Sequence, residues 1–257
     1  MSIDSIPPTV IGLGIVAILS VVIEIGYRIG KAIGRDEGLG KHPLEASVTT
    51  AILSLMAFML GFSFASGAAR QMNRKALSIE DLNASGTAYL RADFLPAELG
   101  IQSKALLREY VRVRSEIVTS GDADKIAPAI ERSSEIQAEL WKIAVEAREV
   151  SDSRAINLFV TAVNDLIDTD AKRQSVALAN RFPAVLWLTL AFLGVLSTTM
   201  LGVSSGLHGR RSRIATTALI VAFSVVVVLI VDLDRPIRSL IKVSNPAVEQ
   251  TIRSMEE

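Results

Sequence analysis

Four long apolar stretches alternate with polar sequence along the chain. They run from about Thr9 to Tyr27, Ser47 to Ala69, Pro183 to Gly206 and Ile214 to Val231. A bilayer core about 30 Å thick needs roughly 20 mainly apolar residues in a helix, so each stretch is long enough to span it. The fourth is rich in β-branched residues, but in lipid every backbone group must be satisfied internally, which favours a helix.

The polar segment between the second and third stretches has the periodicity of amphipathic helices. Apolar residues recur at the i, i+3, i+4, i+7 spacing that buries one stripe of a helix. One helix is indicated by Ile156, Phe159, Val160, Val163, Leu166 and Ile167, a second by Leu106, Leu107, Tyr110, Val111, Val113 and Ile117, and a third by Ile130, Ile136, Leu140, Trp141, Ile143 and Val145. Breaks are expected at Pro96, at Gly121 and over Ser151 to Ser153.

Two helices are expected to cross from lipid into water. Between Ala68 and Tyr89 only Gly86 interrupts the helical sequence, so the second span should continue into the polar segment. A helix passing through Asn180 to Pro183 would do the same on the return. Such helices are suited to transmitting motion, or simply to holding subunits together.

The pattern predicts an all-α, polytopic membrane protein with four transmembrane helices and a helical extramembrane domain inserted between spans two and three. Residues 1–70 hold the first two spans and 71–182 the polar helical domain. Residues 183–231 hold the last two spans, and 232–257 form a short polar tail. The N-terminal region MSIDSIPP has no basic residue, so the first span is expected to be an anchor rather than a cleaved signal.

Composition narrows the function. The 27 basic and 27 acidic residues give no net charge, and no basic block is present, so nucleic acid is not expected as a partner. There is no cysteine, and the two histidines, His42 and His208, lie far apart in the sequence. Nucleotide-binding, metalloprotease and serine-hydrolase motifs are absent. We therefore expect neither an enzyme nor a bound metal or cofactor.

The distribution of basic residues favours one orientation. The face that carries both termini and the central domain has ten basic residues, against seven on the other face. The positive-inside rule therefore places the termini and the central domain in the cytoplasm of a multi-pass protein of the bacterial inner or plasma membrane.

The second span carries the first candidate site. Ser54, Phe58, Phe62 and Ser66 follow one another at four-residue spacing, which places two aromatic rings between two hydroxyls on one face. Around a common axis, such rings would form a hydrophobic constriction. The alternative is that both phenylalanines face lipid or a neighbouring helix. On an adjacent face, positions 61, 65 and 69 hold glycine and alanines whose spacing permits close helix approach.

Two charged groups are further candidates. Glu24 is an acid within the first span, and Arg28 follows one turn later. An ionisable residue at this depth is a functional candidate, but the two could also form an interfacial i, i+4 ion pair. Beyond the fourth span, Asp232, Asp234 and Arg235 could bind a cation, pair with the central domain, or end the helix before Pro236.

Several stretches together resemble the bestrophin-like family of bacterial and plant membrane proteins. They are EIGYRIG at Glu24–Gly30, LGFSFASGAAR at Leu60–Arg70, EDLNASGTAYLRADFLP at Glu80–Pro96, LLREYV at Leu106–Val111 and LDRPIRSLIKVS at Leu233–Ser244. Bestrophins are pentameric anion channels with four spans and a phenylalanine-rich neck on the second. The resemblance implies a homo-oligomeric pore in the lipid bilayer that conducts small inorganic anions. The short tail lacks the acidic cluster of a calcium clasp, so calcium activation is not expected.

These observations lead to three hypotheses. The first is an oligomeric, anion-selective channel whose pore is lined by the second span. The second is a non-conducting membrane scaffold or sensor whose helical domain binds a partner. The third is a transporter that uses Glu24 as a proton relay, although no inverted repeat is recognisable in the sequence.

Overall fold

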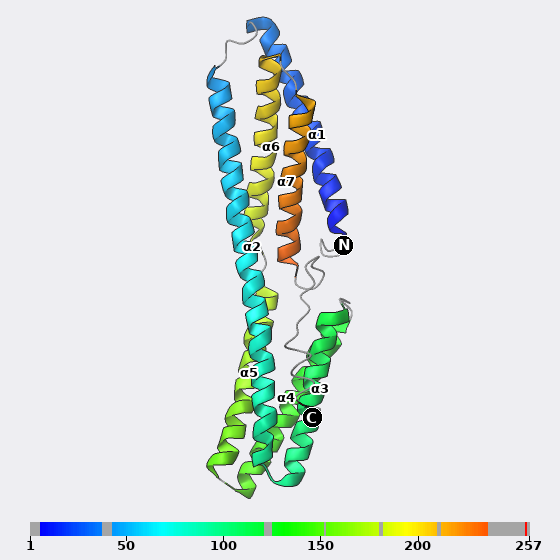
Figure 1. The fold of residues 1–257 in the computed structure, drawn as a ribbon, viewed down its shortest axis with the longest axis vertical. Coiled ribbons are helices and arrows are strands. Elements are labelled where there is room, and N and C mark those ends of the chain that lie inside the picture. Colours follow the sequence, from blue (N-terminus) through cyan, green and yellow to red (C-terminus); the bar gives the residue numbers. More distant parts are fainter. Residues whose placement is uncertain are drawn as a thin grey trace. The chain divides into compact units, whose positions relative to one another are not determined.

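A computed structural model of the chain describes residues 6–37, 43–120, 125–151, 153–179, 182–209, 212–235 and 255. All regular elements among these residues are helical, which confirms the predicted all-α fold. They are α1 (Pro8–Glu37), α2 (Pro43–Arg91), the short 3₁₀ helix η2 (Ala92–Phe94), α3 (Ala97–Ser120), α4 (Ile126–Val150), α5 (Arg154–Ala179), α6 (Ala184–Leu207) and α7 (Arg213–Asp234) (Figure 1).

The chain divides into two compact units. Residues 1–71 and 181–235 form the first, here called the membrane unit. Residues 72–180 and 236–257 form the second, the polar unit. Because α2 is a single helix, its first part belongs to the membrane unit and its last part to the polar unit.

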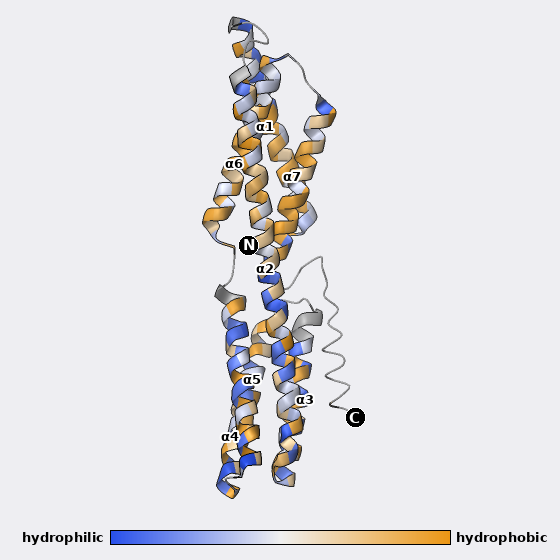
Figure 2. Cartoon of the chain, turned by 60° about the vertical axis from the view of Figure 1, so that its left-hand side comes forward, coloured by the Kyte–Doolittle hydropathy of each residue, from blue (hydrophilic) through white to orange (hydrophobic). Residues whose placement is uncertain are grey.

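The membrane unit contains the four predicted spans. The described chain has four helices long and apolar enough to cross a bilayer: α1, α2, α6 and α7. In Figure 2, α1, α6 and α7 are predominantly coloured as hydrophobic. The chain is therefore a multi-pass membrane protein.

Glycine residues allow helices α1 and α6 to pack closely. A Cβ atom added at Gly26 or Gly30 of α1 would collide with the backbone of α6, at Thr199 and Val203 respectively. The contact is reciprocal, because Gly202 and Gly206 of α6 lie against the backbone of α1. Without a side chain at these four positions, the two helices approach closely, as small residues allow in membranes.

The other contacts in the membrane unit are apolar. Leu19 and Ile23 of α1 form a cluster with Ile220 of α7. Met56 and Leu60 of α2 belong to a second cluster that also contains side chains of α6 and α7. Helices α6 and α7 thus contact both α1 and α2, and they lie between them in Figure 1.

The core of the polar unit is formed by α3, α4, α5 and the last part of α2. Its central side chains include Leu107, Leu140, Phe159 and Leu166, each with no exposed surface. Met255 also packs into this core, and its carbonyl accepts hydrogen bonds from Tyr89 Oη and Arg108 Nε, both at 2.7 Å.

The predicted stripe on α5 is confirmed, since Ile156, Phe159, Val163 and Leu166 are buried. The stripe on α4 was partly wrong, because Trp141 and Val145 are 40% and 46% exposed. The buried residues of this helix instead follow the spacing Ile136, Leu140, Ile143 and Ala147. Positions 141 and 145 lie about 100° around the helix from 140 and 144, enough to bring them to the surface.

The predicted helix breaks are confirmed at Pro96 and around Ser151 and Ser153, whereas Gly121 lies outside the described residues. The continuation of the second span through Gly86 is also confirmed.

A continuous helix into the third span is wrong, because Phe182 and Pro183 are not helical and α6 begins at Ala184. Proline lacks an N–H donor and disfavours helical backbone at the residue before it, which accounts for the interruption.

Candidate functional site

The face of α2 that carries the phenylalanines is exposed in the single chain. Phe58 is 67% and Phe62 is 52% exposed, and Ser54 is exposed on the same stripe. Met56, Leu60 and Ser63 are buried on the other side of the helix. The chain therefore leaves the aromatic stripe of α2 uncovered by its own helices.

The two hydroxyls that flank the rings have different surroundings. The hydroxyl of Ser54 donates to the backbone carbonyl of Thr50 at 2.9 Å. Ser66 is partly buried, and its hydroxyl oxygen accepts a hydrogen bond of 3.1 Å from Arg70 Nη1. The aromatic stripe of α2 therefore ends beside the guanidinium group of Arg70.

The small residues beside this stripe are exposed as well. Apart from the neighbouring backbone of α2 itself, no atom of the described residues lies within 4 Å of the place where a Cβ of Gly61 would be. Ala65 and Ala69 are also exposed. The close helix approach within the chain is made instead by the glycines of α1 and α6.

Glu24 and Arg28 form an ion pair on α1. Their oxygen and nitrogen atoms are 3.0 Å apart, and the side chains are 34% and 76% exposed. Together with Ser20 and two aliphatic side chains they line a shallow depression on the outer surface of α1. The pair therefore lies on the surface of the membrane unit rather than among its helices.

The three charged residues at the end of α7 point into the membrane unit. Asp232 and Arg235 are 1% and 4% exposed. Asp234 Oδ1 accepts a hydrogen bond of 2.9 Å from the backbone N–H of Phe182 and lies 4.0 Å from Arg70 Nε. Arg235 Nη2 donates to the carbonyl of Ile6 at 2.7 Å.

These contacts connect the end of α7 to the starts of α6 and α1 and to α2. The Arg70 guanidinium also stacks on the Phe182 ring, with its central carbon 4.8 Å from the ring centroid. Arg70 and Phe182 were missed as site residues from the sequence, because neither belongs to a local motif with Asp234. The end of α7 is therefore a structural junction between helices.

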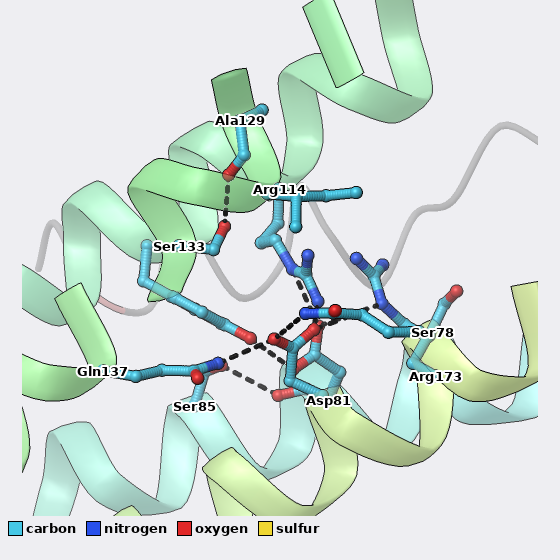
Figure 3. Close-up of polar contacts among 12 residues, drawn as sticks. Ser78, Asp81, Ser85, Arg114, Ala129, Ser133, Gln137 and Arg173 are labelled. Atoms are coloured by element: carbon cyan, nitrogen blue, oxygen red, sulfur yellow. Dashed lines mark hydrogen bonds and ion pairs between the residues drawn. The ribbon is translucent and has the colours of Figure 1, made fainter. Parts of the chain in front are cut away.

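A second group of charges, also missed from the sequence, lies buried in the polar unit (Figure 3). Asp81 of α2, Arg114 of α3 and Asp170 of α5 are each at most 3% exposed. Arg114 pairs with both carboxylates, through Nε at 3.4 Å from Asp81 Oδ2 and through Nη2 with Asp170 Oδ1. Gln137 of α4 donates to Asp170 Oδ2 at 2.8 Å, so that all four helices contribute.

Two more residues complete this buried charge cluster. Arg173 Nε lies 3.8 Å from Asp81 Oδ2. The cluster therefore contains two carboxylates and two guanidinium groups, and their charges balance. Tyr110 Oη donates to Asp81 Oδ1 at 2.8 Å. Burial raises the pKa of the Tyr110 phenol above its usual range, and burial also lowers the pKa of the Arg173 guanidinium. The tyrosine is therefore a neutral donor and the aspartate its acceptor.

A sequence signal for this cluster exists in hindsight. Asp170 follows Val163 and Leu166 at the spacing of the buried stripe on α5, so a carboxylate occupies a core position. Buried charges are retained in proteins when they are paired, which requires a partner on another helix. The sequence does not reveal which of the many arginines provides it.

The described residues contain no group of three histidine, aspartate or glutamate side chains that could hold a metal ion. His42 lies outside the described residues, and His208 hydrogen-bonds through Nδ1 with the carbonyl of Ser204 at 2.8 Å.

Comparison with known proteins gives matches for the family and the fold. The family model for a Bestrophin-like domain matches residues 38–247. No relative is found among curated proteins.

Among solved structures, a variant of a bacterial bestrophin homologue from Klebsiella pneumoniae superposes with a TM-score of 0.69 at 15% identity, covering 96% of this chain and 97% of that one. Another structure of a bacterial bestrophin homologue from Klebsiella pneumoniae gives a TM-score of 0.66 at 17% identity, with 96% of each chain covered.

Proposed function

Given that the chain belongs to the bestrophin-like family, we propose that it assembles into an oligomeric ion channel whose pore is lined by α2. The observation that carries this proposal is the exposed aromatic stripe of α2. Copies arranged around an axis would bring Phe58 and Phe62 together as rings of aromatic side chains. Such rings form a hydrophobic constriction that gates by dewetting.

The permeant species proposed is a small inorganic anion, and the assembly proposed is a homopentamer, both by analogy with bestrophins. Two features support a conducting role for the stripe. Ser54 supplies a hydroxyl above the rings, and Ser66 supplies one below them, where its oxygen accepts a hydrogen bond from Arg70.

The experiment is reconstitution of the full-length protein in planar bilayers. We expect chloride currents from the native chain and a larger current from the Phe58→Ala, Phe62→Ala double variant, because smaller side chains leave a wider and better hydrated constriction. In asymmetric potassium chloride, the reversal potential should shift toward the chloride equilibrium potential.

The matched control is Phe192→Ala. Phe192 of α6 is an equally exposed aromatic residue of a span, at 66%, but it is not on α2. Its replacement should leave the current unchanged. Absence of current from both the native chain and the double variant would reject the channel and favour the non-conducting scaffold. A reversal potential near that of potassium would reject anion selectivity alone.

A further inference from the structure

The outer surface of α1 carries a polar stripe within a membrane span. Ser20, Glu24 and Arg28, here called the α1 polar stripe, follow one another at one-turn spacing. Three quarters of the Arg28 side chain is exposed in the single chain. Charged side chains in membrane spans nearly always face protein or water rather than lipid. A neighbouring protein surface would take the stripe out of contact with lipid.

Contacts with α6 identify the part of α2 that lies at the same depth. Gly26 of α1 lies against Thr199 of α6. Thr49 Oγ1 of α2 lies 3.5 Å from the carbonyl oxygen of Met200, the next residue of α6. The region of α1 that holds the polar stripe and the region of α2 around Thr49 thus meet the same turn of one helix.

At this depth α2 exposes hydroxyl groups. Thr50 and Ser54 are both exposed, one turn apart. Their hydrogens are donated to backbone carbonyls of α2, at 2.9 Å in each case. A hydroxyl oxygen that donates in this way keeps acceptor capacity, so the pair can accept hydrogen bonds from a guanidinium.

Thr50 lies to one side of the aromatic stripe of α2. At 100° per residue, Thr50 lies about 80° around the helix from Phe58 and about 120° from Phe62, and Ser54 lies at the border between Thr50 and the stripe. A helix that turns Phe62 toward an axis would therefore turn Thr50 toward a neighbour. Gly61, which has no side chain, lies on the same side as Thr50, within about 20° of it, and leaves room for close approach.

We infer that the α1 polar stripe of one copy docks on the Thr50–Ser54 surface of α2 in the next copy of the chain. The inference rests on the proposed oligomeric assembly. Since α6 and α7 separate the two surfaces within one copy, the contact is head-to-tail, and such contacts repeat around a ring. The Arg28 guanidinium would then donate to hydroxyl oxygens in place of facing lipid.

The absence of cysteine makes the test direct. Copies with Glu24→Cys and copies with Thr50→Cys, carrying different tags, are co-expressed and oxidised in membranes. A disulfide forms only when the Cα atoms are within about 7 Å, so we expect a covalent dimer that contains both tags. A chain with both substitutions should give a ladder of bands up to the full ring.

The control pairs Ile18→Cys with Thr50→Cys. Ile18 is 59% exposed on α1 but lies about 120° around the helix from Glu24. This pair should give no mixed dimer. The inference is overturned if Glu24→Cys copies link only to each other. It is also overturned if the native protein is an oligomer but the Glu24→Cys and Thr50→Cys copies form no mixed dimer. Chloride current without the mixed dimer would reject this interface alone, whereas the mixed dimer without current would reject the channel alone.

Discussion

Single residues decide how closely the spans pack. The sequence pointed to positions 61, 65 and 69 of α2 as small residues that permit close approach, and the structure leaves them exposed. The close approach within the chain uses Gly26 and Gly30 with Gly202 and Gly206. Both sets have the same four-residue spacing, so spacing alone could not indicate which of them meets a partner in the same chain.

The first prediction concerns Gly30. The methyl group of Gly30→Ala would collide with the backbone of Val203, and backbone in a helix cannot yield locally. We expect a loss of about 1–3 kcal/mol, the usual cost of overpacking, measured as a lower unfolding midpoint in detergent.

Gly14→Ala on the same helix is the matched control, since among the described residues no atom beyond the neighbouring backbone of α1 lies within 4 Å of a Cβ there. Equal midpoints for the two variants would contradict the close contact between α1 and α6.

At the scale of elements, the helices followed from periodicity. The apolar stripes predicted α3, α4 and α5 because each helix buries one face, and Pro96 predicted the break before α3. The interruption at Phe182 was missed because Pro183 was interpreted as the first residue of a span, where a missing N–H has no cost. The restriction that proline places on the residue before it determines the break.

The buried charge cluster could not be predicted from the sequence. Asp81, Arg114 and Asp170 come from three helices and have no shared motif. Their pairing depends on the packing of the helices, which periodicity does not specify.

The second prediction is made for this cluster. Asp170→Asn removes a carboxylate from Arg114 and leaves a buried positive charge without full compensation. Loss of one member of a buried pair costs about 3–5 kcal/mol. The polar unit should therefore unfold at a lower urea concentration, and the backbone amides of α5 should exchange their hydrogens faster. Asp168→Asn, at an exposed position two residues earlier, should leave exchange in α5 nearly unchanged. Similar exchange rates in both variants would contradict a stabilising role for the cluster.

The third prediction is a pH dependence at the surface of the same unit. Arg132 donates to both oxygens of Glu109, at 2.7 and 3.0 Å. These hydrogen bonds lower the pKa of Glu109 below its ordinary value of 4.5. A carboxyl group whose pKa is lower in the folded state stabilises the fold above its unfolded pKa and loses this contribution as pH falls.

Unfolding followed across about pH 5 to pH 3 should therefore show a steeper loss of stability for the native chain than for Glu109→Gln. Glu131→Gln, on the exposed surface of α4, serves as the comparison. Parallel pH profiles of native chain and Glu109→Gln would show that the pair contributes nothing.

At the scale of the whole molecule, four spans and an inserted helical unit were predictable because lipid demands long apolar segments. We propose that the polar unit lies in the cytoplasm, because the distribution of basic residues in the sequence favours this orientation. The site residues predicted on α2 stay a prediction, since their role depends on neighbouring copies of the chain.

The orientation can be tested with single cysteines. Ser134→Cys lies on the exposed surface of α4, and Ser212→Cys lies between α6 and α7. In intact cells a membrane-impermeant thiol reagent should label Ser212→Cys only, whereas opened membranes should allow labelling of both. Labelling of Ser134→Cys in intact cells would reverse the proposed orientation.

The glycine contact between α1 and α6 also limits the order in which the spans can pack during synthesis of the protein. Roughly 170 residues separate Gly30 from Gly202, and a ribosome that adds about 5–20 residues per second needs on the order of ten to thirty seconds to reach the second from the first. During that interval α1 is already made while its partner does not exist. Its glycine face must be shielded by lipid or by the insertion machinery until α6 arrives, so the first span is among the last to find its final neighbour.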